Sequence, residues 1–489
     1  MEKVRRPGPS GHPLILLATA LLAIGCHAAP GGPDRNLAGA RSLPTGDTLR
    51  VPYESEESVI QVANRYPLAA AGNMARATDQ DPFADTSALE VDALVDEVLK
   101  RNPSVPALVS AWQVAAERYP QVISLDDPTF GFMLGPGTFG NSAVDFAWMV
   151  NGSQKLPWPG KLRLRGNVVH AEASAAFQDI EELRLRLTEA AKVIFFDYYV
   201  VHRQIEVNED NIRRVQEFRD ISQTKYESNL VTQQDVFQAE VELAELEKRR
   251  VELERTDRVA RARINTLLHR APDHALPPPP THVGVTHSLP PAQALRQMAI
   301  ERRPDLAAKA ARIRAEEAAV ELAAREFYPD FEIMARYDGF WQERELRPMV
   351  GLNLNLPIQL ERRRAAVREA IARVTRERAE FEQLLDQIQY EVHAAFERVN
   401  ESHRVVDLYA KRIIPAAKDN LESARAGYIA GRVDFLRLIE AQRQLYGHQE
   451  KQYDTVADHH RRLAELERVL AGPITTAAET RSMAPPNER

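Results

Sequence analysis

The chain repeats its own sequence pattern, and this internal repeat limits its possible folds more than any other feature. Asn102-Pro103 matches Arg303-Pro304 at an offset of 201 residues, and Leu156-Pro157 matches Leu356-Pro357 at an offset of 200. Four later landmarks match at an offset of 202: Tyr226 with Tyr428, Val231 with Val433, Ala239 with Ala441, and Leu243 with Leu445. The pattern predicts one architecture built twice, over residues 86–275 and 289–473, joined by a proline-rich linker at 276–288.

Each half has the order helix, two strands, very long helix, turn, long helix. Residues 166–226 contain no proline and no internal glycine, so they predict one helix of roughly 90 Å at 1.5 Å per residue. Six apolar or aromatic residues and Asn208 follow one another here at alternating intervals of four and three: Ile194, Tyr198, Val201, Ile205, Asn208, Ile212 and Val215. This heptad spacing predicts supercoiled helix packing. In the second half, Pro415 should interrupt the corresponding helix.

Four segments alternate between apolar and polar residues, as strands do. The first segment begins at Phe130, and the other three are residues 144–151, 331–338 and 349–356. Such strands fit a membrane β-barrel with lipid outside and water inside; a small soluble sheet packed on helices is the alternative. Even small barrels need about eight strands. A barrel therefore implies an oligomer.

The N-terminal sequence has the features of a targeting segment. Basic residues precede an apolar run at 14–24, which predicts a signal peptide over residues 1–25. The small residues before Cys26 resemble a bacterial lipobox, which implies a lipid, such as palmitate, on this cysteine. An ordinary signal peptide with a chance cysteine is the alternative. Residues 26–85 are expected to form an extended arm, and residues 474–489 a flexible tail.

Composition argues against several classes of function. The 63 basic and 70 acidic residues give a net charge of −7, whereas a nucleic-acid binder usually carries a basic field. The single cysteine excludes a disulfide framework and a CxxC zinc site. No GxGxxG, GKS/T or GxSxG motif is present. The histidines lack ligand spacing, so neither a metal site nor a cofactor is expected.

Three motif strings carry a family resemblance: Leu156-Pro-Trp-Pro-Gly-Lys161, Ile414-Pro-Ala-Ala417, and Ala426-Gly-Tyr-Ile-Ala-Gly431 leading into Leu438-Ile-Glu-Ala-Gln442. With the repeat and the lipobox they resemble TolC-type outer-membrane efflux proteins, specifically the lipoprotein branch. The resemblance implies a mainly α-helical protein with a membrane β-barrel: a homotrimer whose 12-stranded barrel continues into a coiled-coil tunnel in the periplasm. It implies a lipid-anchored outer-membrane conduit rather than an enzyme. The partners would be a periplasmic adaptor and an inner-membrane RND-type pump, and the cargo metal cations or drugs.

The turns of the two long hairpins are the expected functional region. The resemblance implies a periplasmic gate in which Asp235 ties to Tyr428. Thr232 to Asp235 also fits a helix-capping box, which is the local alternative. The family's acidic ring maps to Arg437 and Glu440, so this chain departs at Arg437. These two residues lie three apart and either pair with each other or face the lumen, where Arg437 would be neutralised by Glu440 or Asp235.

Adaptor docking is expected at the turns themselves. Gly431 suits the sharp reversal of the second hairpin, and Asn229 that of the first. The predicted docking residues are Asn229, Leu230, Val231, Thr232, Gly431, Arg432 and Val433.

Two other classes compete with the channel. A lipid-anchored periplasmic adaptor would have one hairpin flanked by β domains, not two hairpins with barrel-like strands. A lipid-anchored hydrolase would need a nucleophile with a base, or a carboxylate pair, and the sequence shows neither pattern.

Overall fold

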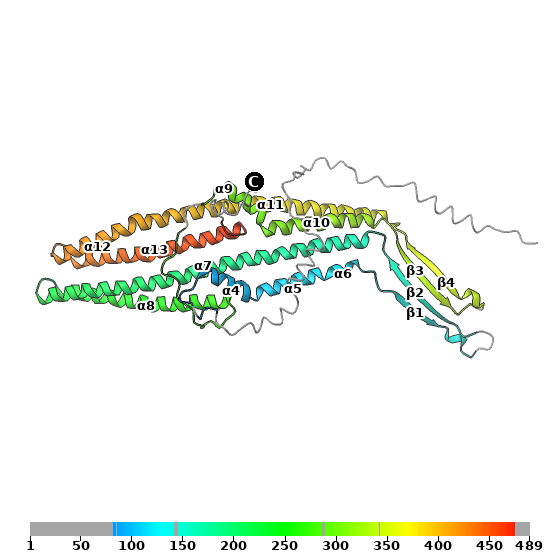
Figure 1. Cartoon of the computed structure of the whole chain (residues 1–489), viewed down its shortest axis with the longest axis horizontal. Helices are drawn as coiled ribbons and strands as arrows, with labels where there is room; N and C mark the ends of the chain where they lie inside the picture. Colours follow the sequence, from blue (N-terminus) through cyan, green and yellow to red (C-terminus); the bar gives the residue numbers. More distant parts are fainter. Residues whose placement is uncertain (1–81, 85, 141–144, 286–288, 342, 475–489) are drawn as a thin grey trace, which may run out of the picture. The chain divides into compact units, whose positions relative to one another are not determined.

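The structure is a computed structural model that describes residues 82–84, 86–140, 145–285, 289–341 and 343–474 (Figure 1). These residues belong to the unit that begins at Ser55. The predicted signal peptide, Cys26 and nearly all of the arm lie outside the described residues. So do residues 286–288 of the linker and all but the first residue of the predicted tail.

Long helices dominate both halves. The first half contains α4 Val91–Arg101, α5 Ser104–Ala116, α6 Arg118–Ile123, α7 Lys161–Glu227 and α8 Gln233–Leu267. The second contains α9 Ala292–Arg302, α10 Pro304–Arg325, α11 Leu360–Leu408, α12 Ile414–Ile429 and α13 Phe435–Val469. With 67 residues, α7 is about 100 Å long and confirms the predicted long helix. None of the described helices is both long and apolar enough to cross a membrane.

The second-half counterpart of α7 is interrupted, as Pro415 predicts. A π-helical turn at Tyr409–Ile413 separates α11 from α12, and Pro415 stands in the first turn of α12. Proline has no amide hydrogen to donate to the preceding turn. The hydrogen-bond ladder therefore changes register here.

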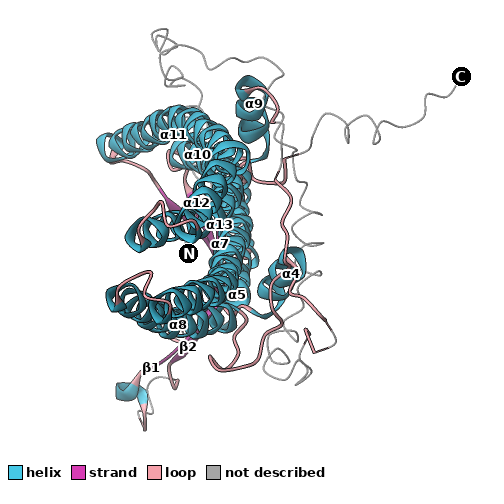
Figure 2. Cartoon of the chain, turned by 90° about the vertical axis from the view of Figure 1, so that its left-hand side faces the viewer, coloured by secondary structure: helices cyan, strands magenta, loops and turns pink. Residues whose placement is uncertain are grey.

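The long helices pair as two hairpins, α7 with α8 and α12 with α13. Seen end-on in Figure 2, α8, α7, α13 and α12 follow one another, and across the two hairpins α13 packs much more on α7 than on α8. Near the turns, one apolar cluster joins all four helices. Its central members are Phe218 of α7, Ala239 of α8, Tyr428 of α12 and Leu438 of α13, all buried.

The strands form one antiparallel sheet in chain order: β1 Thr129–Leu134, β2 Trp148–Leu156, β3 Asp330–Asp338 and β4 Pro348–Asn355. Short 3₁₀ turns, Pro136–Thr138 and Arg344–Leu346, lie in the loops that follow β1 and β3. The β2–β3 pairing joins the two halves, with Val150 opposite Tyr337 and Leu156 opposite Phe331. In the described chain, β1 and β4 are the edges.

The register gives the sheet one apolar and one polar face. Phe130, Ala335 and Val350 share the apolar face, where Phe130 and Val350 are 81% and 84% exposed. On the other face a chain of hydrogen bonds crosses all four strands. Thr129 Oγ1 lies 2.8 Å from Ser153 Oγ, Ser153 donates to Glu332 at 2.7 Å, and Asn353 donates to Glu332 at 3.2 Å.

The second strand lies later in the sequence than its pattern predicts. The alternation favours a strand at 144–151, but β2 begins at Trp148 and continues to Leu156. Its second part, Asn151 to Lys155, has little apolar character of its own. Cross-strand pairing on both sides places these residues in the sheet, and a single-sequence pattern cannot show that pairing.

A buried lysine fastens the sheet to the long helices where the halves meet. Lys161, at the start of α7, is 1% exposed, and its Nζ lies 2.9 Å from Asp330 Oδ1 and 3.3 Å from Glu326 Oε2. Asp330 Oδ1 also accepts a bond from the Trp158 amide at 2.8 Å. The string Leu156 to Lys161 thus connects β2 and α7 of one repeat to β3 of the other.

Candidate functional site

Both hairpins reverse through a residue in the left-handed backbone region. Asn229 has φ 56° and Gly431 has φ 71°. The Leu230 amide donates to the Lys225 carbonyl at 2.8 Å, and the Arg432 amide to the Gly427 carbonyl at 2.9 Å. These bonds close the helix ends in the Schellman manner. The predicted reversals at Asn229 and Gly431 are confirmed.

Tyr428 connects the two hairpins. Its side chain is 2% exposed, and its hydroxyl lies 2.9 Å from Ser222 Oγ on α7. The same hydroxyl donates to Asp235 Oδ2 on α8 at 3.2 Å. The ring packs edge-on against Phe435, with centroids 5.4 Å apart. The structure therefore contains the contact between Asp235 and Tyr428 that the resemblance implies.

Ser222 and Lys225 belong to this cluster but were not predicted from the sequence. Lys225 Nζ lies 4.4 Å from the centre of the Tyr428 ring and donates to the Tyr428 carbonyl oxygen. Ser222 is fully buried and donates to the Phe218 carbonyl at 2.9 Å. In the sequence, Lys225 is only a cation in the last turn of a helix, where the helix dipole favours one. Its partner lies about 200 residues away, so no local signal indicates the contact.

Burial governs the protonation of the central pair. It raises the pKa of Tyr428 to about 12, so the phenol remains a donor at neutral pH. Burial also raises the pKa of Asp235; the Tyr428 hydrogen bond and Lys225 oppose the rise, and Asp434 adds to it.

The capping box, which was the alternative role for Asp235, does not form in the structure. Thr232 is the N-cap of α8 but accepts no side-chain capping bond, and only its carbonyl oxygen receives the Asp235 amide, at 3.2 Å. In the second hairpin Asp434 is the N-cap and accepts the Arg437 amide at 3.3 Å. The Asp235 carboxylate is thus directed across the hairpins rather than onto its own helix.

Within the described residues of one chain, Arg437 does not contact its expected partners, Glu440 and Asp235. Arg437 Nε lies 3.9 Å from Asp434 Oδ1, and Arg437 pairs with neither Glu440 nor Asp235. Asp434 already sits over the first turn of α13 as its cap, which makes it the nearer carboxylate. In the part of the chain that the structure describes, Glu440 is exposed and makes no hydrogen bond or ion pair.

The seven predicted docking residues lie at the two turns. Leu230 is 72% exposed; Asn229, Thr232, Gly431 and Arg432 are also exposed, and Val231 and Val433 are half-buried. They therefore offer a mixed apolar and polar surface at the hairpin ends.

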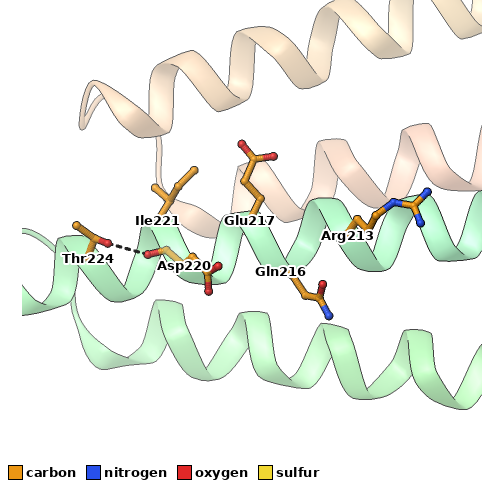
Figure 3. A pocket seen from close by; sticks show the side chains of 6 residues that line it. All are labelled: Arg213, Gln216, Glu217, Asp220, Ile221 and Thr224. Atoms are coloured by element: carbon orange, nitrogen blue, oxygen red, sulfur yellow. Dashed lines mark hydrogen bonds between the residues drawn. The ribbon is translucent and has the colours of Figure 1, made fainter.

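A shallow groove runs along α7 close to this cluster (Figure 3). It is lined by Arg213, Gln216, Glu217, Asp220, Ile221 and Thr224. Glu217 is held by an ion pair with Arg425 of α12, and the Thr224 hydroxyl donates to the Asp220 carbonyl at 3.0 Å. This lining contains no nucleophile paired with a base. Elsewhere among the described residues, no three His, Cys, Asp or Glu side chains gather as metal ligands.

Comparison with known proteins assigns the second half. Residues 295–472 match the model of the family described as outer membrane efflux protein. The chain carries an outer membrane efflux protein domain. The comparison with curated protein sequences gives no match.

Solved structures of outer-membrane efflux channels share the fold of both halves. The outer membrane protein VceC of Vibrio cholerae is 18% identical, with 79% of this chain and 97% of that chain covered and a TM-score of 0.66. CusC is 16% identical over 82% and 96%, with a TM-score of 0.68. The outer-membrane channel MtrE of Neisseria gonorrhoeae, in its open state, is 16% identical over 78% and 89%, with a TM-score of 0.64. The fold is therefore that of these outer-membrane channels, and the adaptor alternative is not supported.

Proposed function

We propose that this protein is the outer-membrane exit duct of a tripartite efflux system, conducting its cargo passively from an inner-membrane pump. The observation that carries the proposal is the combination of two long helical hairpins with a four-stranded sheet whose two edges have no partner strand among the described residues. An unpaired edge is a template for further strand pairing.

In a trimer, each of these edge strands would find a partner strand in a neighbouring chain. In the proposed assembly, β4 of one chain pairs with β1 of the next, which closes twelve strands into a barrel. The apolar face, with Phe130 and Val350 almost fully exposed in the single chain, would meet lipid. The polar face, crossed by the hydrogen-bond chain through Ser153 and Glu332, would line the water-filled interior.

The hairpins would extend the duct into the periplasm and end in a gate. The Tyr428 cluster ties α12 to α7 and α8, so its hydrogen bonds hold the hairpin ends together. The exposed turn residues, with Leu230 the most exposed apolar one, would receive a periplasmic adaptor. A lipid on Cys26 would anchor the mature N-terminus in the outer membrane.

Reconstitution tests the proposal. Full-length protein purified from membranes should form ion-conducting channels in planar bilayers, and light scattering in detergent should give roughly three times the mass of one chain. A monomeric mass together with silent bilayers would refute the duct. The cargo class would follow from transport assays with the cognate pump.

A further inference from the structure

Two ion pairs in the described part of the chain join α8 of the first hairpin to α13 of the second, farther from the turns than the Tyr428 cluster. Arg443 Nε of α13 donates to Glu242 Oε2 of α8 at 2.7 Å, and Arg249 of α8 donates through Nη2 to Glu450 Oε1 of α13 at 3.1 Å. Both pairs join residues 201 apart in the sequence, so they connect corresponding levels of the two halves.

Together with the Tyr428 contact, these pairs form a ladder along α8, whose first partner lies on α12 and whose next two partners lie on α13. Asp235, Glu242 and Arg249 follow one another on α8 at intervals of seven residues, which places them on one face about 10.5 Å apart. Arg443 and Glu450 have the same interval on α13. Because α8 and α13 both lead away from a hairpin turn, they run parallel and remain in register.

One of the two ion pairs contains a buried carboxylate, and the other contacts a half-buried tyrosine. The Glu242 side chain is only 7% exposed, so a lost partner would leave a buried carboxylate unpaired. The Tyr446 hydroxyl lies 2.9 Å from Glu450 Oε1 and 3.2 Å from Asn208 Oδ1 of α7. The ladder is thereby fastened to a third helix.

The charges also fix the register. In the pair nearer the turns α8 supplies the acidic residue, Glu242, whereas in the next pair α8 supplies the basic residue, Arg249. If α13 slid by one heptad, Glu242 would meet Glu450 in one direction, and Arg249 would meet Arg443 in the other. Like charges at these positions disfavour both slipped states.

We propose that the contacts of Asp235, Glu242 and Arg249 form a three-rung zipper that opens from the turns upward and prevents one hairpin from sliding along the other. The inference rests on the proposed function, because it describes how the gate of the duct would part. Opening is then graded: each rung broken frees about two more helical turns.

Hydrogen exchange of the full-length protein in detergent tests the zipper without relying on conduction. Arg443→Glu should accelerate amide exchange in α8 and α13 between the turns and the middle rung by roughly fivefold to tenfold, as expected for one modest contact. Glu242→Arg combined with Arg443→Glu should return exchange to within about twofold of the starting protein. Lys451→Glu is the matched control, because the ion pair of Lys451 lies within its own helix, with Asp454 at 3.0 Å.

The order of opening is tested by comparing hydrogen exchange in variants that each break a different rung. Tyr428→Phe should accelerate exchange only next to the turns, and Arg443→Glu should extend the effect toward Arg249. Equal acceleration up to Glu450 in both variants, or no difference between Arg443→Glu and Lys451→Glu, would overturn the zipper. The expected exchange pattern in a protein that forms no channels would support the zipper and overturn only the duct.

Discussion

Tyr428 shows how one side chain can hold two hairpins together. Its phenol reaches α7 through Ser222 and α8 through Asp235, while its ring and carbonyl oxygen contact Lys225. Each hydrogen bond contributes about 0.5–1.5 kcal/mol, and a symmetric oligomer repeats the set in every chain. Small changes at this residue should therefore have a measurable effect on opening.

Removing the hydroxyl and the carboxylate should open the gate. Tyr428→Phe combined with Asp235→Ala deletes both cross-hairpin hydrogen bonds and keeps the ring packed on Phe435. We expect open-channel events in planar bilayers to become roughly ten times more frequent, with normal assembly. The control is Tyr226→Phe, the equivalent tyrosine of the first repeat, which is 37% exposed. Identical recordings from both variants would place the constriction elsewhere.

The gate should close more firmly in acid. Burial raises the pKa of Asp235 above its ordinary value of 3.8, so the closed contact binds a proton more tightly than an open, hydrated carboxylate does. Its stability is greatest at low pH and is lost as the pH rises through the raised pKa. Conductance should fall as the pH is lowered from about 7 toward 4, and Asp235→Asn should flatten the profile. A rise in conductance on acidification would contradict this assignment.

Among elements, the long helices follow directly from the sequence and the strands follow less closely. The proline-free run from 166 to 226 and Pro415 predict α7 and the break before α12, because helix signals are local. The Asp235–Tyr428 contact was expected from the resemblance. Ser222, Lys225 and the second part of β2 were missed, because their places depend on partners about 180 to 200 residues away.

The exposed face of β4 should matter for assembly rather than for the fold of one chain. Leu352→Arg places a cation on the face expected to meet lipid, at about 2–4 kcal/mol per chain if it lies near the bilayer midplane. The fraction of oligomer measured by light scattering in detergent should fall sharply. Asn353→Arg, the same change on the opposite face beside Glu332, should assemble normally. Equal assembly of both variants would show that the two faces do not differ in this way.

At the scale of the whole molecule, we expect two membrane attachments: a lipid on Cys26 at the mature N-terminus and the apolar face of the sheet. Intact-mass measurement of protein extracted from membranes should show loss of residues 1–25 and a lipid increment on Cys26. Cys26→Ser should remove the increment while leaving the channel fold intact, since the described residues make up the fold without it. A mature chain that begins elsewhere and carries a free thiol would rule out the anchor.

The pairing of β2 with β3 has a consequence for how the chain folds. The two hairpins close through turns of a few residues and can form as soon as each is synthesised. By contrast, Val150 must wait for Tyr337, nearly two hundred residues later, before the central pairing of the sheet exists. Contacts of such sequence separation form slowly. Pulsed hydrogen exchange during refolding should therefore protect α7 and α8 before β2 and β3, and simultaneous protection would contradict this order. Until β3 arrives, the first half carries an apolar ribbon with an unpaired edge, the state in which the chain is most vulnerable to aggregation.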